Sequence, residues 1–328
     1  MKTLITGSTG FIGRHLVRKL LEKNRAIRCL VRPKSNINEL KKQEVEISFG
    51  DLLNKDSLKK AVKDVNIVYH LAGEVFAKKC SDYFKTNVLG TENLLNACLS
   101  ENIEKIIHLS SIGAVGPNPD RDNLLTEESL CYPINSYGRS KYEGERVALS
   151  YYHKFGLPIV VISPPIVYGP GQPDVLNGVF KQVYQKNFFI VGDGKCLRSL
   201  CYIDNLIYGL SLVEEHKKAE GQVFFIADEK VYTFNEILRT IAAEEGVEFK
   251  EKHIGEWLGN FSLAVFKLLE KKLSLSLMSL YAIGALILNF GCDISKAKRE
   301  LGYQPQIDLQ EGMKRTVNSL KDLLSKYQ

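Results

Sequence analysis

With 328 residues the chain is long enough for roughly two domains, and its 45% of hydrophobic residues suffices for a full core. Its net charge of +6 is mild and no basic stripe carries interleaved aromatics, which argues against a nucleic-acid partner and suits an anionic cofactor. The seven cysteines form no CxxC pair or Cys/His cluster, and the first apolar residues belong to a predicted strand rather than a signal peptide, so we expect a cytoplasmic protein without a metal site.

The N-terminal stretch 2–13, KTLITGSTGFIG, predicts a strand, a glycine-rich turn and a helix over 11–22. The first glycine permits the tight turn, the second lets the backbone approach a pyrophosphate, and the third lets the helix pack close to the strand. The N–H groups and dipole at the start of the helix also favour phosphate. The alternative is an ordinary strand-to-helix turn. We predict a dinucleotide-binding turn made of Gly7, Ser8, Thr9, Gly10, Phe11, Ile12 and Gly13.

A second strand is predicted over 26–31. Dinucleotide-binding folds usually place an acidic residue after this strand to hold the ribose 2′-hydroxyl, but this chain has Arg32, with Lys34 nearby. A guanidinium beside an ammonium suits a 2′-phosphate, so NADP(H) is favoured over NAD(H), which remains the alternative. A solvated basic loop would explain the same residues.

Further strands are predicted over 45–49, 65–71 and 105–109, alternating with a helix that starts near Asp56 and another over 82–101. This alternation predicts an α/β fold with a doubly wound parallel sheet, whose ligand site lies at the carboxyl ends of the strands. We expect cofactor contacts there. Asp51 can either hydrogen-bond the adenine amino group or cap the following helix. The other candidates at these ends are Leu52, Leu71, Ala72 and Gly73.

After a loop over 116–136, Tyr137 and Lys141 stand four residues apart on one face of a predicted helix. An ammonium near a phenol lowers the pKa of the phenol from about 10 toward neutrality, which makes Tyr137 a usable general acid/base. Ser111, at the end of the preceding strand, offers a hydroxyl that can hold a substrate oxygen. A surface tyrosine and lysine on a helix face would give the same pattern.

These motifs together resemble the extended short-chain dehydrogenase/reductase family, the group of NAD-dependent epimerases, dehydratases and 3β-hydroxysteroid-dehydrogenase-like reductases. The resemblance covers nearly the whole chain. It is carried by TGxxGxxG at 6–13, Ser111, YxxxK at 137–141, YGPG at 168–171, GDG at 192–194 and YID at 202–204.

The resemblance implies that hydride moves between a nicotinamide and a substrate carbon. It implies that Tyr137 exchanges a proton with the substrate oxygen, that Lys141 binds the nicotinamide ribose and tunes the tyrosine, and that Ser111 steadies the carbonyl or alcohol. Asn87 matches a helix residue that anchors a proton-relay water, and Pro164 matches a backbone contact to the nicotinamide end. It also implies a homodimer, paired through the helices that carry Asn87 and residues 148–152.

Departures from the family pattern favour one branch. No carboxylate follows the serine pair, Ser110 and Ser111, in the run 112–115. Ile166 stands where epimerases usually have Asn, and 273–290 lacks the arginine that grips a diphosphate. Only Arg198 matches a diphosphate-binding residue. The resemblance therefore favours an apolar ketone or secondary alcohol, sterol- or flavonoid-like, as substrate. The alternatives are an NDP-sugar epimerase of the UDP-hexose type that retains its NAD, and a non-catalytic member.

We expect a Rossmann domain over 1–170, to which about 200–228 returns, and a smaller, mostly helical substrate cap over 171–199 and 229–328. A capping box at Thr233 and Glu236 predicts a helix over 234–245. Residues 273–290 are eighteen without a charge, the borderline length for a membrane span. They predict buried cap helices, or else peripheral membrane contact through 257–290 with its flanking lysines, and least of all a span.

Overall fold

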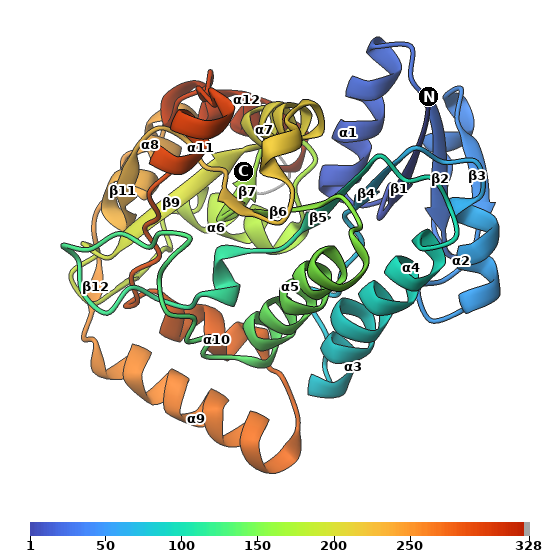
Figure 1. The fold of residues 1–328 in the computed structure, drawn as a ribbon. Coiled ribbons are helices and arrows are strands. Elements are labelled where there is room, and N and C mark those ends of the chain that lie inside the picture. The colour runs from blue at the N-terminus through green and yellow to red at the C-terminus, as the bar shows by residue number, and fades with distance from the viewer. Residues whose placement is uncertain (325–328) are drawn as a thin grey trace.

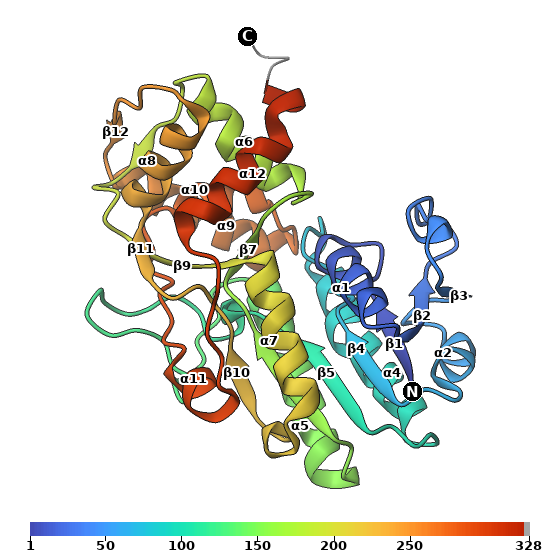
Figure 2. The ribbon, with the colours of Figure 1, turned by 90° about the horizontal axis from the view of Figure 1, so that it is seen from above.

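The computed structural model describes residues 1–324 and is built around a seven-stranded parallel sheet (Figures 1 and 2). Its order is β10-β6-β5-β4-β1-β2-β3, and every neighbouring pair is parallel. The order reverses between β1 and β4, which places the ligand crevice there. The strands are β1 (Lys2–Thr6), β2 (Ala26–Val31), β3 (Glu46–Phe49), β4 (Ile67–His70), β5 (Lys105–Leu109), β6 (Ile159–Ser163) and β10 (Val223–Phe225).

Helices cover both faces of this sheet, which confirms the doubly wound fold. The sheet is buried on both sides, as β1 shows: the neighbouring residues Leu4 and Ile5 belong to different hydrophobic clusters on opposite faces of the sheet. One cluster includes side chains of α1 (Phe11–Glu22) and α7 (Ile203–Glu215). The other includes side chains of α2 (Lys55–Val62), α4 (Gly90–Cys98) and α5 (Ser136–Phe155).

The C-terminal part lies to one side of the main sheet (Figure 2) and is mostly helical, as expected. It also holds a three-stranded sheet, β11-β9-β7, and a two-stranded one, β12-β8. The predicted capping box at Thr233 is present. Its elements are β7 (Ile166–Tyr168), α6 (Asp174–Tyr184), β8 (Ile190–Val191), β9 (Leu197–Tyr202), β11 (Val231–Thr233), α8 (Phe234–Glu245), β12 (His253–Ile254), α9 (Trp257–Leu273), α10 (Met278–Ala285), α11 (Ser295–Leu301) and α12 (Leu309–Leu324).

Two local details differ from the simplest expectation. The helix predicted over 82–101 is present as a continuous stretch over 80–98, but it contains a π-helical turn η2 (Lys85–Leu89) between α3 (Cys80–Phe84) and α4, and Asn87 lies in the π turn. Asp51 does not cap α2, because the side chain of Asn54 accepts the N–H of Ser57 and is the cap. The carboxylate of Asp51 instead accepts the N–H of Leu53, in a tight turn of its own.

The region 273–290 forms only one short helix, α10, which follows the loop 274–277. Four of its residues are serine or asparagine, and the chain turns before and after α10. Within residues 1–324, helices that are both long and apolar enough to cross a bilayer do not occur.

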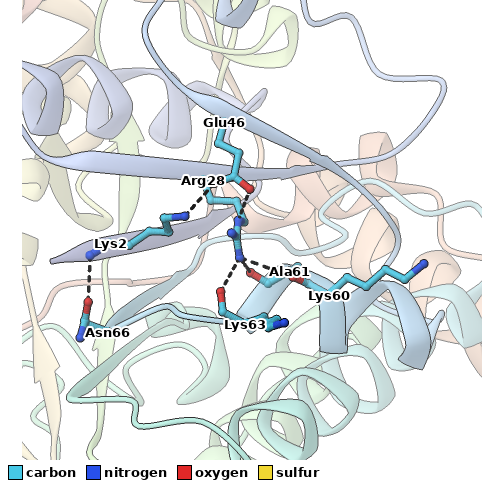
Figure 3. Close-up of polar contacts among 7 residues, drawn as sticks. All are labelled: Lys2, Arg28, Glu46, Lys60, Ala61, Lys63 and Asn66. Carbon is cyan, nitrogen blue, oxygen red and sulfur yellow. Dashed lines mark hydrogen bonds and ion pairs between the residues drawn. The ribbon is translucent and has the colours of Figure 1, made fainter.

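A buried arginine joins the sheet to α2 (Figure 3). Nη1 of Arg28 donates to the carbonyl oxygens of Ala61 and Lys63, at 2.8 and 2.7 Å, and Nε donates to the carboxylate of Glu46 at 2.7 Å. The guanidinium thus satisfies carbonyl groups that α2 leaves unpaired at its end.

Replacing this arginine should therefore destabilise the fold. We expect Arg28→Met to lower the free energy of unfolding by about 2 kcal/mol, because the helix carbonyls lose their donors in a buried place. Lys2→Met, which removes only the exposed ion pair with Glu46, should cost less than about 1 kcal/mol. Denaturant unfolding measures the free energy of unfolding of both variants. Equal losses would show that the buried contacts of Arg28 to α2 add no stability beyond that of an exposed ion pair.

Candidate active site

The turn between β1 and α1 has no room for side chains at its glycines. Gly7 has φ +74°, and a Cβ there would lie 2.7 Å from the backbone nitrogen of Ala72. A Cβ on Gly13 would lie 2.1 Å from the carbonyl oxygen of Gly7, so helix and strand pack as closely as the spacing predicts. Gly10 is the N-cap of α1, and its N–H donates to the carbonyl of Gly7 at 3.0 Å.

A cavity of about 480 Å³ extends from this turn across the carboxyl ends of the strands to α6 and α10. It brings together residues predicted separately from the glycine turn, the serine pair, the Tyr–Lys helix and the cap. The predicted residues that line it are Gly7, Gly10, Phe11, Ile12, Gly13, Leu71, Gly73, Ser111, Tyr137, Lys141, Pro164, Ile166 and Arg198.

The other predicted residues lie outside this lining. Ala72 donates its N–H to Thr6 Oγ1 at 3.1 Å, and Leu52 is buried against α4. Arg32 follows β2 directly and is exposed. The full set outside the lining is Ser8, Thr9, Arg32, Asp51, Leu52, Ala72 and Asn87.

The start of α5 holds the predicted acid–base pair. Asn135 caps the helix by accepting the N–H of Gly138 at 2.7 Å. Lys141 is buried, and its Nζ donates to the carbonyl oxygen of Leu109 at the end of β5. Ser111 follows β5, and its Oγ accepts the N–H of Gly113 at 3.1 Å.

The pKa of Tyr137 is not lowered toward neutrality in the protein without a bound cofactor, so this expectation was wrong. Burial raises the pKa of Tyr137 above its usual value of 10, although a hydrogen bond with Ser111 opposes this, and nearby Tyr83 adds to the rise. The rings of these two tyrosines meet edge to face with centroids 6.0 Å apart. Counting charges along the helix cannot reveal this effect, because it comes from desolvation by the surrounding elements.

Burial also acts on the lysine. It lowers the pKa of Lys141 from 10.5 to about 8, and the nearby carboxyl of Glu145 partly opposes the shift. The folded protein therefore holds, at neutral pH, an ammonium that its surroundings disfavour.

Removing this ammonium should stabilise the cofactor-free protein. We expect Lys141→Met to raise the free energy of unfolding at pH 7 by about 2 kcal/mol, the burial penalty less the hydrogen bond to Leu109. Between pH values of about 8 and 10.5 the unfolded chain binds more protons than the folded one, so wild-type stability rises with pH there. The difference between the two proteins should shrink accordingly.

Urea unfolding at several pH values between neutrality and the unfolded pKa of lysine measures this difference. Lys154→Met, at the exposed end of the same helix, is the control and should change stability by no more than about 0.5 kcal/mol. A destabilised Lys141→Met protein at neutral pH would contradict the burial penalty.

The side chain of Asn87 binds other protein groups. Its Nδ2 donates to Ser140 Oγ at 2.8 Å and to the carbonyl oxygen of Glu74 at 3.0 Å, and its Oδ1 accepts the N–H of Glu74 at 2.7 Å. These bonds join the loop after β4 to α5. Asn87 therefore positions the loop that bears Gly73, and its role beside a relay water stays a prediction.

The sequence analysis missed several groups of this site. Glu145 lies one helical turn beyond Lys141, and its Oε2 accepts Ser163 Oγ at 3.4 Å. Burial raises the pKa of this carboxyl, opposed by its hydrogen bond from Ser163. The repeated spacing of four along 137, 141 and 145 was the available signal. Lining residues that sequence reasoning did not select include Glu74, Val75, Phe76, Asn135, Met278 and Tyr281.

Arg198 lies in the cavity wall and is held by main-chain oxygens. Nη1 donates to the carbonyls of Leu197 and Leu288, and Nη2 donates to that of Ala285. Its guanidinium carbon also lies 5.6 Å from the ring centre of Phe290. Of the five N–H groups of an arginine, three are thus directed to the protein.

Known proteins share this architecture. A model described as the NAD dependent epimerase/dehydratase family matches residues 3–227. The uncharacterized protein y4nL of Sinorhizobium fredii is 33% identical, over 96% of this chain and 94% of its own length. The 3beta-hydroxysteroid-dehydrogenase/decarboxylase isoform 1 of Arabidopsis thaliana is 27% identical, over 99% of this chain and 81% of its own. UDP-glucuronic acid 4-epimerase from Bacillus cereus, solved with UDP-glucuronic acid and NAD, is similar with a TM-score of 0.79 and 26% identity, covering 98% of this chain and 100% of that one.

Proposed function

This chain belongs to the NAD dependent epimerase/dehydratase family, and we propose from that premise that it is an oxidoreductase of apolar ketones or secondary alcohols, sterol- or flavonoid-like. The resemblance to the extended short-chain dehydrogenases/reductases is thereby confirmed at the level of the family. When bound, a nicotinamide cofactor supplies or accepts the hydride.

The hydrogen bonds of Arg198 to the main chain are the observation that supports an apolar substrate over a sugar nucleotide. A sugar nucleotide brings a diphosphate, which needs cationic partners with free donors, and arginine suits that task through paired N–H groups. Here three N–H groups of Arg198 are directed to main-chain carbonyls. Among the lining residues that the structure describes, Lys141 is the other cation, and it lies beside Leu109 at the acid–base pair.

The rest of the wall is largely apolar, with Ser199 and Tyr281 as polar groups on the side of the C-terminal part. A pocket of this kind suits a hydrophobic molecule that is oriented by a few placed polar groups. Ser111 and Tyr137 supply such groups at one end. The apolar side chains include Val75, Phe76, Ile166, Leu176, Met278, Ala285 and Phe290.

The residues present fit a dinucleotide. Gly7 and Gly13 let the turn, the segment after β4 and α1 pack together without side chains, and the turn and the start of α1 line the cavity with bare backbone at Gly7, Gly10 and Gly13. We propose that these groups hold the pyrophosphate and that Leu71, Gly73 and Pro164 contact the remainder. At the other end Lys141 binds the ribose, and Tyr137 moves a proton to or from the substrate oxygen that Ser111 holds.

We propose NADP(H) as the preferred form. Arg32 is exposed at the carboxyl end of β2, and within residues 1–324 it forms no ion pair that would neutralise it. NAD(H) is the alternative, supported by the family description and by the NAD in the similar epimerase structure. Asp51 and Leu52 follow the neighbouring strand and remain candidates for the adenosine half.

The test of this function is calorimetric titration followed by turnover. The protein is titrated with NADPH, NADH, UDP-sugars and a set of sterol and flavonoid ketones, and each binding pair is then assayed. We expect tight binding of a nicotinamide cofactor, binding of an apolar ketone to that complex, and weak or no binding of UDP-sugars. Tight binding of a UDP-sugar would overturn the substrate class.

An NDP-sugar epimerase that retains its NAD is the second candidate. It is favoured by the fold shared with a UDP-glucuronic acid epimerase over nearly the whole chain. Such an enzyme would turn over without added cofactor, because the hydride returns to the same substrate. The requirement for added cofactor therefore separates the two.

We further propose that the protein is a homodimer in the cytoplasm. Leu89, Leu99 and Phe155 are exposed near the helices α4 and α5, on one side of the sheet, where a second copy would cover them. The seven cysteines are all unpaired, which agrees with a reducing compartment. Light scattering tests the dimer, and a single-chain mass would contradict it.

A further inference from the structure

Helix α9 is apolar on two sides, and protein covers only one of them. Leu263 and Phe266 are buried beneath the helix. On the opposite side Trp257 is 67% exposed, Phe261 62% and Leu268 50%. With Ala264 these residues follow the spacing of a single helical stripe. Figure 1 shows α9 as the outermost helix at the lower edge of the view, with α10 between it and α5.

Leucines and lysines extend this stripe into a larger surface. Leu273, Leu275 and Leu277 are exposed where the chain leaves α9. The loop before α3 lies alongside, because the N–H of Ser276 donates to the carbonyl of Lys78 at 2.8 Å. We call the α9 face the surface made by Trp257, Phe261, Ala264, Leu268, Leu273, Leu275 and Leu277 with Lys78, Lys79, Lys267, Lys271 and Lys272.

The α9 face is basic as well as apolar. Its five lysines are exposed, and none of them is in an ion pair within the part of the chain that the structure describes. The acid within the helix, Glu270, turns inward instead. Its carboxylate accepts the N–H of Ser136 at 3.0 Å and pairs with Arg139 at 2.9 Å. Positive charge on this face is therefore left for an external partner.

The α9 face adjoins the entrance of the cavity. Val75 and Phe76, on the loop that runs to Lys78, are 41% and 49% exposed and also line the cavity. Met278, which follows Leu277 directly, and Tyr281 line it from α10. An apolar molecule that moves from a layer at the α9 face into the cavity would thus contact apolar side chains all the way.

We propose that the α9 face binds to an anionic lipid surface, from which an apolar substrate enters the cavity. Aromatic and leucine side chains beside unpaired lysines match the boundary between acyl chains and anionic headgroups, with α9 lying in the plane of the interface. The route of the substrate rests on the proposed function. The binding does not, and it is measured without turnover, so the two can fail separately.

The test uses the full chain with vesicles of phosphatidylcholine, with and without phosphatidylglycerol. Trp257 is the single tryptophan, so its fluorescence reports on this face alone. We expect co-sedimentation with the anionic vesicles that weakens with added salt, a shift of Trp257 emission to shorter wavelength, and shielding from an aqueous quencher. A protein that stays in solution at low salt, or whose Trp257 emission does not move, would overturn the proposal.

Two matched double variants distinguish binding through the α9 face from binding through the overall positive charge of the protein. Lys271→Gln/Lys272→Gln removes two charges from the last turn of α9, and binding should fall about 5-fold per lysine, about 25-fold in all. Lys59→Gln/Lys60→Gln removes the same charges from the last turn of α2 and should leave binding unchanged. Equal losses would overturn the assignment to α9. A blue-shifted Trp257 in a concentration-dependent dimer without lipid would also overturn it, in favour of a second copy.

Discussion

Tyr137→Phe is expected to lower kcat by about 10³-fold while the affinity for the nicotinamide cofactor stays within about a factor of two. The phenol is the group that exchanges a proton with the substrate oxygen in the proposed mechanism, and phenylalanine keeps its ring but cannot donate. The ring packs edge to face on Tyr83 and is partly buried, so the variant retains its packing. Steady-state kinetics and cofactor titration measure the two quantities.

Tyr142→Phe is the matched control, since Tyr142 lies on the same helix and its ring lies under Arg146, outside the cavity lining. It should keep full activity. A fully active Tyr137→Phe protein would show that the acid–base assignment is wrong, and loss of cofactor binding along with turnover would indicate damage to the fold. A wild-type protein that binds cofactor but turns over no substrate would favour a non-catalytic member.

Arg32→Asp is expected to shift the ratio of NADPH to NADH affinity by roughly 100-fold toward NADH. A charge-assisted bond to a 2′-phosphate contributes about 1.5–3 kcal/mol, and an aspartate both removes it and repels the phosphate. The same carboxylate can accept the 2′-hydroxyl of NADH. The measurement is the pair of dissociation constants for the two cofactors.

Arg18→Asp makes the same change of charge on the exposed side of α1 and serves as the control. It should alter both affinities equally and leave their ratio alone. An Arg32→Asp protein whose ratio matches the wild type would contradict the 2′-phosphate assignment and would favour NAD(H).

Much of the main sheet followed from local patterns. The predicted bounds of β2 and β5 and of the helix at 234–245 agree with the structure residue for residue. Each is a short apolar run or a periodic segment whose ends are marked by specific residues, such as the capping box at Thr233. The π turn at Asn87 was not predictable in this way, because its extra residue serves tertiary bonds to Glu74 and Ser140.

The site was predictable in its residue types and less so in its energetics. The residues of the glycine spacing and the Tyr–Lys pair line one cavity, and both patterns depend on local geometry. The raised pKa of Tyr137 and the main-chain bonds of Arg198 depend on how distant segments cover them. Nothing near residue 198 in the chain indicates that carbonyls from 285 and 288 take up its donors.

The function is tested most directly by the balance between cofactor oxidised and alcohol formed. The protein is mixed with NADPH and an apolar ketone that binds to its cofactor complex, and both products are quantified over the same time. One alcohol formed for each NADPH consumed is the predicted result. Interconversion of a UDP-hexose with no added nicotinamide and no net oxidation would contradict it.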